Sequence, residues 1–459
     1  MRLALKVIAG VTLAWWAVVG AILLWLGLSP PELLRVGTGY TAKLVCSNVF
    51  IAGRNAGDVL AFDVQAPGNA LLRLVGVSVD TASRSVTARM AGFIAPQTAI
   101  ARNGLGCAVV PKGQERAARA LSLAETEPLP PLPDAPWPQG DAEAQTIAPL
   151  AGILSNPDLL GPGMRAVIVI RDGRIIGEAY GAGFSRPLPL IGWSMAKTVN
   201  AALIGRLVEQ GRIGLDDRDL LPAWTNDSRR DISLSSLLAM ESGLAFNEEY
   251  GNVSDATRML FLEPDMADFA ATRPKIAEPG QSFSYSSGTG VLLSRIWMNR
   301  VGDAQAALDF PRQALFGPLS MRSAVLEADA AGTFVGSSYL YATARDWARF
   351  GLLLADDGVW NGTRLLPEGF VEAMATPTEA SKGAYTRLQA WKEGPGGVPN
   401  AASGVPDDTF WLIGHDGQSM AVIRSQSLVV LRMGLTPSSL GYRPEPLVKA
   451  VARAVNRGG

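Results

Sequence analysis

The first pattern along the chain is an uncharged apolar run from Val7 to Leu28, preceded by Arg2 and Lys6. As a helix that rises about 1.5 Å per residue, this run would cross the roughly 30 Å hydrocarbon core of a bilayer. It predicts a retained single-pass anchor at residues 1–28, with the rest of the chain on the periplasmic side of the cytoplasmic membrane. A cleaved signal peptide is the alternative, although its apolar region is typically about 7–15 residues long.

Two runs beyond the anchor, Val75–Val79 and Ser85–Met90, alternate apolar residues with small or polar ones. They flank the polar stretch Thr81–Arg84, a pattern that is typical of a β-hairpin. A helix is expected to open at Cys46. Residues 39–120 are therefore predicted to form a small α/β module, and they carry no catalytic motif.

The two cysteines of the chain, Cys46 and Cys107, both follow the predicted anchor. In an exported chain such a pair predicts a disulfide. Closing a loop of about 60 residues would contribute roughly 4 kcal/mol in the chain-entropy model. Two buried free thiols are the alternative.

A proline-rich stretch runs from Pro128 to Pro138. Such a stretch is extended and poor in backbone donors, so it acts as a semi-rigid spacer. Residues 121–140 are predicted to link the module to a main domain at 141–459.

The main domain has strand patterns near both ends and helical patterns between them. A helical insertion is predicted at about 216–325, where loops and amphipathic runs replace strand patterns. The predicted strands are Arg165–Ile170, Arg174–Tyr180, Phe410–Ile413, Ser419–Arg424 and Leu428–Met433, the first two joined by the hairpin signal Asp172-Gly173. This arrangement predicts an α+β fold, with an antiparallel sheet flanked by helices.

Composition narrows the possible functions. The 41 basic and 42 acidic residues are spread along the chain and give a net charge of −1. No basic stripe suggests a nucleic-acid partner. One histidine and two cysteines do not supply the ligands of a usual zinc site, so neither a metal nor another cofactor is expected.

Candidate chemistry begins in the stretch Gly192-Trp193-Ser194-Met195-Ala196-Lys197. A serine and a lysine three residues apart at a helix start share a face, about one turn apart. The helix N-terminus also directs N–H groups and a positive dipole at the serine. S-x-x-K is the first motif of β-lactamases and penicillin-binding proteins. An ordinary capped helix start is the alternative.

Two later stretches contain further candidates. Tyr285 and Ser287 lie in a polar loop, and a phenol becomes a general base only if a neighbouring cation such as Lys197 lowers its pKa. Gly414-His415-Asp416-Gly417-Gln418 holds the one histidine, between glycines that let the backbone approach a ligand. A surface turn and a structural histidine are the alternatives.

The ordered set Ser194-x-x-Lys197, Tyr285-x-Ser287 and His415-x-Gly417 resembles the serine hydrolases of the class C β-lactamase fold. It is most similar to the branch of 6-aminohexanoate-dimer hydrolases and related esterases. The resemblance covers about residues 141–459. Further runs that look like this branch are Ser236–Leu244, Pro279–Phe283 and Thr343–Gly351.

The resemblance implies a role for each motif residue. Ser194 would be the acylated nucleophile. Lys197 would relay its proton and hold Tyr285 partly ionised. Tyr285 would be the base in acylation and would protonate the leaving group. Backbone N–H groups of Ser194 and Gln418 would form the oxyanion hole. The implied substrate-binding residues are Ser287, which takes the place of an asparagine, His415, Gly417, and Tyr250, which resembles a loop tyrosine that closes on substrate.

One departure from the family pattern bears on the substrate. β-Lactamases carry a lysine at the position of His415, and that permanent cation holds the substrate carboxylate. A histidine with an ordinary pKa near 6.5 is mostly neutral at pH 7. We therefore expect hydrolysis of an ester or small amide, with a D-amino-acid peptidase or weak β-lactamase activity as the alternative.

Two rival interpretations remain open. Gly192-Trp193-Ser194-Met195-Ala196 approximates the G-x-S-x-G elbow of α/β-hydrolases, with His415 as a late triad histidine. The domain could also be a non-catalytic binder in the cell envelope. The predicted helical block argues against the first, and the complete set of Ser194, Lys197 and Tyr285 argues against the second.

Overall fold

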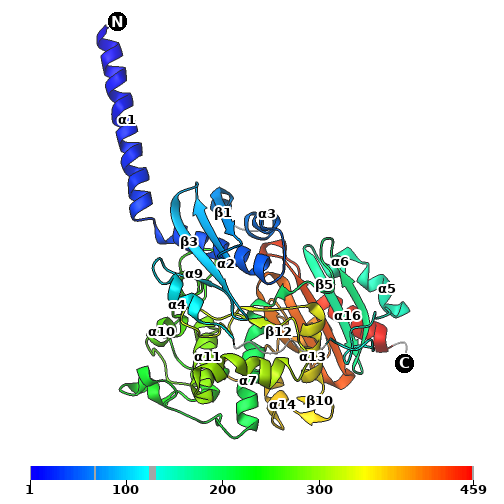
Figure 1. The fold of residues 1–459 in the computed structure, drawn as a ribbon. Helices are drawn as coiled ribbons and strands as arrows, with labels where there is room; N and C mark the ends of the chain where they lie inside the picture. Colours follow the sequence, from blue (N-terminus) through cyan, green and yellow to red (C-terminus); the bar gives the residue numbers. More distant parts are fainter. Residues whose placement is uncertain (1, 67–68, 124–130, 457–459) are drawn as a thin grey trace.

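The computed structural model describes residues 2–66, 69–123 and 131–456. Helix α1 (Arg2–Leu28) projects away from the rest of the chain (Figure 1). Its segment Ala4–Leu28 is long and apolar enough to cross a membrane, and none of it is buried. A signal sequence would pass the same test, so the retained anchor stays a prediction.

The segment after α1 packs one long helix on a small sheet, and residues 32–120 are called the N-terminal module below. Its four antiparallel strands follow the order β1-β2-β3-β4. Cys46 lies near the end of α2, so the expectation that a helix opens there is wrong. The elements are α2 (Glu32–Phe50), α3 (Ala56–Asp58), η1 (Val59–Gln65), η2 (Ala70–Leu74), β1 (Val75–Asp80), β2 (Ser85–Met90), β3 (Ile94–Arg102), β4 (Gly106–Val109) and α4 (Glu115–Ala120).

A disulfide joins Cys46 in α2 to Cys107 in β4. Beside it, Glu327 of the main domain accepts hydrogen bonds from Lys43 Nζ (2.5 Å), Ser47 Oγ (2.8 Å) and the backbone N–H of Cys107 (2.7 Å). Lys43 and Glu327 are almost fully buried. A buried charge is stable only with such partners, so these contacts fix the module against the main domain.

The described part of the proline-rich stretch packs on helix α13 (Ala344–Ala355). Residues 128–130 of that stretch lie outside the described residues. Trp137 is buried, and Arg349 of α13 donates hydrogen bonds to the carbonyls of Pro138 (3.2 Å) and Gly140 (3.0 Å). These contacts attach the end of the proline-rich stretch to the main domain.

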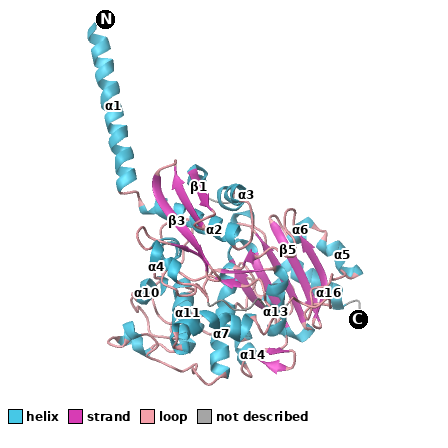
Figure 2. Cartoon of the chain, in the orientation of Figure 1, coloured by secondary structure: helices cyan, strands magenta, loops and turns pink. Residues whose placement is uncertain are grey.

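The main domain is built on a five-stranded antiparallel sheet in the order β12-β13-β14-β5-β6. Early and late strands meet where β5 pairs with β14, for example Val169 with Val430. The α+β prediction is therefore confirmed, and Figure 2 shows the strands of this sheet beside the helices that cover them. The strands are β5 (Met164–Arg171), β6 (Arg174–Tyr180), β12 (Phe410–Gly414), β13 (Gln418–Ile423) and β14 (Leu428–Gly434).

Alternating residues of this sheet face two different cores. Val167 and Val169 of β5 pack with Val448 and other apolar residues of the terminal helices. Ile168 of the same strand belongs to a larger core that includes Trp347 of α13. The period of two along β5 therefore buries both faces of the sheet. The helices of the first face are α5 (Ala148–Leu154), α6 (Pro157–Leu160) and α16 (Glu445–Asn456).

The chain between β7 (Leu190–Ile191) and β8 (Val325–Leu326) carries a run of helices, and the insertion at about 216–325 stays a prediction. Its elements are α7 (Ala196–Glu209), η4 (Pro222–Trp224), η5 (Ser228–Asp231), α8 (Leu234–Leu238), α9 (Asp255–Leu262), α10 (Met266–Ala271), α11 (Ser287–Val301), α12 (Ala304–Pro311) and η6 (Arg312–Phe316). The remaining elements are β7 (Leu190–Ile191), η3 (Trp193–Met195), β8 (Val325–Leu326), β9 (Leu340–Ala342), β10 (Val359–Trp360), β11 (Thr363–Arg364), α14 (Phe370–Ala375), α15 (Asn400–Ser403), η7 (His415–Gly417), η8 (Arg424–Gln426) and η9 (Ser438–Leu440).

Candidate active site

Ser194 lies in a tight turn between a short strand and a long buried helix. Strand β7 leads into the 3₁₀ turn η3, and α7 follows directly. Trp193 has φ +48°, in the left-handed region that bulky residues rarely adopt. Such strain is typical of positions whose geometry serves function, and here it directs the turn that presents Ser194.

Two glycines bring the edge of the main sheet against this turn. A Cβ on Gly414, the last residue of β12, would lie 2.2 Å from the carbonyl oxygen of Gly192. A Cβ on Gly192 would lie 2.2 Å from the Trp347 ring. Neither position has room for a side chain. Gln418 pairs with Gly414 across the hairpin, so the third motif and Ser194 line one cavity.

Lys197 is buried in the first turn of α7 and has three oxygen partners. Its Nζ lies 3.1 Å from Ser194 Oγ, 3.1 Å from Ser287 Oγ and 2.9 Å from the Ser337 carbonyl oxygen. Burial lowers the pKa of Lys197 to about 8, and the Glu248 carboxylate opposes that shift. A group with a pKa near 8 can both hold and release a proton close to neutral pH.

Glu248 is a site residue that the sequence patterns did not indicate. Its Oε1 accepts hydrogen bonds from Ser287 Oγ (2.5 Å) and Tyr250 Oη (2.8 Å), and its Oε2 accepts one from the Ser287 backbone N–H (2.7 Å). Ser287 is the first residue of α11, where the helix dipole favours an anion. In the sequence, Glu248 could have been found only from its position two residues before Tyr250, which was a candidate.

Tyr285 lies beside Ser194 and Lys197, in the loop before α11. Lys197 Nζ lies 4.7 Å from the centre of its ring. Enclosure raises the pKa of the Tyr285 phenol, and the neighbouring Ser194 hydroxyl opposes this shift. The expectation that Lys197 holds Tyr285 partly ionised is thus wrong in direction, because the loss of hydration outweighs the other influences.

Tyr250 and His415 lie on the open side of Ser194. Their rings are 5.2 Å apart, and the His415 ring also meets Trp193 edge-on at 5.8 Å. His415 Nε2 lies 3.4 Å from Asp416 Oδ1, and half of the His415 side chain is exposed. Within the described residues His415 makes no hydrogen bond to Ser194, so the geometry does not favour the nucleophile-elbow interpretation.

Gly417 and Gln418, which follow His415, are held in place by contacts with the neighbouring strand β14. Gly417 has φ +82°, and a Cβ there would lie 2.7 Å from Arg432 Nη1. The Gln418 side chain donates to the Gly434 carbonyl (2.5 Å) and accepts from the Gly434 N–H (2.9 Å). Because its side-chain amide is bonded to Gly434, Gln418 can donate a hydrogen bond to a substrate only from its backbone N–H.

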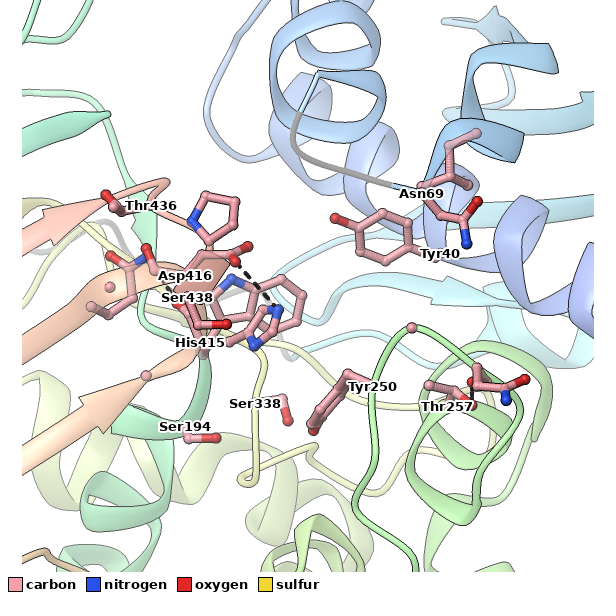
Figure 3. A pocket seen from close by; sticks show the side chains of 18 of the residues that line it. Tyr40, Asn69, Ser194, Tyr250, Thr257, Ser338, His415, Asp416, Thr436 and Ser438 are labelled. Carbon is pink, nitrogen blue, oxygen red and sulfur yellow. Dashed lines mark hydrogen bonds and ion pairs between the residues drawn. The ribbon is translucent and has the colours of Figure 1, made fainter. Parts of the chain in front are cut away.

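A cavity of about 800 Å³ reaches Ser194 from this open side. Figure 3 shows Ser194, Tyr250, Ser338 and His415 at one end and Tyr40 and Asn69 at the other. The second group belongs to the N-terminal module, for which the sequence indicated no part in the site. Lys197, Tyr285 and Ser287 contact Ser194 or its neighbours but are not among the residues that line this cavity.

The model of the Beta-lactamase family matches residues 157–444, which is more than half of the chain. The chain belongs to the Beta-lactamase family. The match includes every motif residue of the site, from Ser194 to Gln418. The predicted family relationship is thereby confirmed, and the chain is a hydrolase of this family.

The chain is similar to proteins with several different descriptions. A 6-aminohexanoate-dimer hydrolase from Paenarthrobacter ureafaciens is 23% identical over 273 residues, which is 54% of this chain and 69% of that protein. A penicillin-binding protein homologue from Caulobacter crescentus has a TM-score of 0.54 at 15% identity, over 68% of this chain and 99% of its own. A family VIII carboxylesterase has a TM-score of 0.53 at 16% identity, over the same shares. These structural likenesses establish the fold.

Proposed function

We propose that the protein cleaves an ester or small amide through an acyl-enzyme on Ser194. The hydrogen bonds around Lys197 carry this proposal. The Ser337 carbonyl can only accept, and the Ser287 hydroxyl already gives its proton to Glu248. The two N–H groups of a neutral Lys197 therefore donate to these two oxygens, and its lone pair points toward the Ser194 hydroxyl.

Acylation follows from this arrangement. Lys197 takes the proton of Ser194 as Oγ attacks the substrate carbonyl carbon. Tyr285, a neutral phenol beside Ser194, gives its proton to the leaving oxygen or nitrogen and regains one from Lys197. The net result is transfer of the serine proton to the leaving group, with Ser194 acylated.

The developing oxyanion needs donors at fixed positions. The backbone N–H groups of Ser194 and Gln418 are the proposed pair, since both residues line the cavity at the nucleophile. Water attack on the acyl-enzyme, with Lys197 as base, completes hydrolysis and restores Ser194.

The surroundings of Ser194 bear on substrate class. His415 stands where β-lactamases carry a lysine, and an imidazole is not a permanent cation that can hold a substrate carboxylate. The proposal therefore favours esters and small amides over β-lactams. For location, we propose that α1 anchors the chain in the cytoplasmic membrane with the hydrolase on the periplasmic side.

Covalent labelling tests the proposal. The full chain is treated with a small fluorophosphonate and its intact mass is read beside that of Ser194→Ala. A single adduct that the variant lacks is expected, together with turnover of p-nitrophenyl acetate. A folded protein that takes up no adduct would overturn the proposal and favour a binding domain.

A further inference from the structure

The two ends of the cavity differ in chemistry. The end at Ser194 is polar, with Tyr250, His415 and Gln418 around the nucleophile. The other end belongs largely to α2 and η2 and is mostly apolar, with Tyr40 and Asn69 as its polar members. Its lining residues there are Leu33, Leu34, Val36, Leu71, Leu72 and Met90.

The apolar end opens on an exposed apolar rim. Leu71 lines the cavity and is 40% exposed, and Leu74 of the same 3₁₀ helix is 58% exposed. The Leu74 carbonyl accepts a hydrogen bond from the Ala91 N–H (2.9 Å), which puts it at the same end of the sheet as Phe93, itself 51% exposed. An apolar rim at a cavity mouth is typical of a site that contacts lipid or another apolar partner.

The rim lies close to the start of the membrane-spanning candidate. Only Ser29, Pro30 and Pro31 separate α1 from α2, and this connection can extend about 14 Å. Helix α1 also contacts β3, and Figure 1 shows the small sheet beneath the lower end of α1. The wall of the cavity is therefore adjacent to the place where α1 would leave a bilayer.

From this juxtaposition we infer that the substrate is an amphiphilic ester with a long acyl chain, taken from the membrane on which the enzyme is anchored. The inference rests on the proposed function of Ser194. The acyl chain lies along α2 and η2, and the ester group reaches Ser194. Ser194 Oγ bonds to the acyl carbon, the alcohol leaves with one proton, and water then releases the fatty acid.

The test compares acyl chain lengths in two matched variants. Gly37 of α2 lines the cavity, and a Cβ there would meet only Leu72 Cδ2, at 3.3 Å, the end of a flexible side chain. Gly37→Leu therefore shortens the apolar end. Gly76→Leu makes the same change in the same module, where nothing lies within 4 Å. The full chain is assayed in phosphatidylcholine nanodiscs with p-nitrophenyl acetate and p-nitrophenyl decanoate.

For the unaltered protein, kcat/KM is expected to be at least about tenfold higher for the decanoate, because each buried methylene favours binding. Gly37→Leu should lower that ratio by about tenfold, and Gly76→Leu should leave it within about twofold. Equal ratios in all three proteins, with Ser194 still labelled by the fluorophosphonate, would overturn the inference alone. Loss of labelling in the unaltered protein would overturn the proposed function instead.

Discussion

The two ends of the cavity are held in different ways. Beside Ser194, the side chains of Lys197, Ser287 and Glu248 are joined by hydrogen bonds of 2.5–3.1 Å. At the other end, leucine side chains of α2 and η2 form a wall that is partly exposed. Proton transfer requires fixed positions, whereas apolar binding requires only volume and lack of charge. Changes at the first end should therefore alter chemistry, and changes at the second should alter stability or preference.

The largest expected effect is that of Lys197→Met, which keeps the side-chain length but removes the proton acceptor. We expect kcat for p-nitrophenyl acetate to fall by about 10³-fold, within the range for loss of a positioned base. Steady-state kinetics on a variant with an unchanged circular dichroism spectrum provide the measurement. A loss of less than about tenfold would favour the nucleophile-elbow mechanism.

Next in size is the effect of Lys43→Met on the contact between the N-terminal module and the main domain. It leaves the Glu327 carboxylate buried without its cation, so the free energy of unfolding should fall by about 3–5 kcal/mol. Urea unfolding measures this. The double variant Lys43→Met with Glu327→Gln should recover part of the loss. If the single and the double variant have the same free energy of unfolding, the unpaired Glu327 charge does not cause the loss of stability.

Glu248→Gln should change the pH dependence of catalysis. Neutral Lys197 is the proposed base, so kcat/KM should rise with pH through the Lys197 pKa of about 8. The Glu248 carboxylate raises that pKa, so its removal should move the rise to lower pH, with about a tenfold loss of rate from misplacement of Ser287. Glu249→Gln, one residue along and exposed, is the control. Identical profiles for both variants would contradict the role of Glu248.

The smallest effect is expected for Tyr250→Phe. The variant loses the hydrogen bond to Glu248 but keeps the ring against His415. KM should rise about three- to fivefold with little change in kcat, as for a group that binds substrate and transition state alike. A fall in kcat with unchanged KM would instead assign Tyr250 to the chemical step.

The sequence allowed the fold class and the group around Ser194 to be predicted. A continuous apolar run at Arg165–Ile170 and the turn signal Asp172-Gly173 located the hairpin β5–β6, because a strand buried on both faces carries few polar residues. The spacing of Ser194 and Lys197 on one helical turn is a local property, and the structure brings both together with Tyr285 and Ser287. Their catalytic roles stay predictions until they are tested.

Other features depend on tertiary contacts that no spacing encodes. Glu248 reaches Ser287 because its loop folds back over α11, and Ser254 stabilises that loop by donating to the Glu249 carbonyl (2.6 Å). The raised pKa of Tyr285 reflects enclosure by distant segments. The apolar wall of the cavity comes from α2, whose sequence carries no motif. To predict any of these three features, one would have to know which segments of the chain pack together.

The short connection from α1 to α2 also bears on how often enzyme and substrate meet. With α1 in a bilayer, as proposed, the three intervening residues hold the start of α2, whose residues line the apolar end of the cavity, close to lipid-borne esters. Encounter then occurs by lateral diffusion in two dimensions. The reaction rate should follow the number of substrate molecules per unit area of bilayer, unchanged when the suspension is diluted with buffer but reduced when substrate-free lipid is fused into the vesicles.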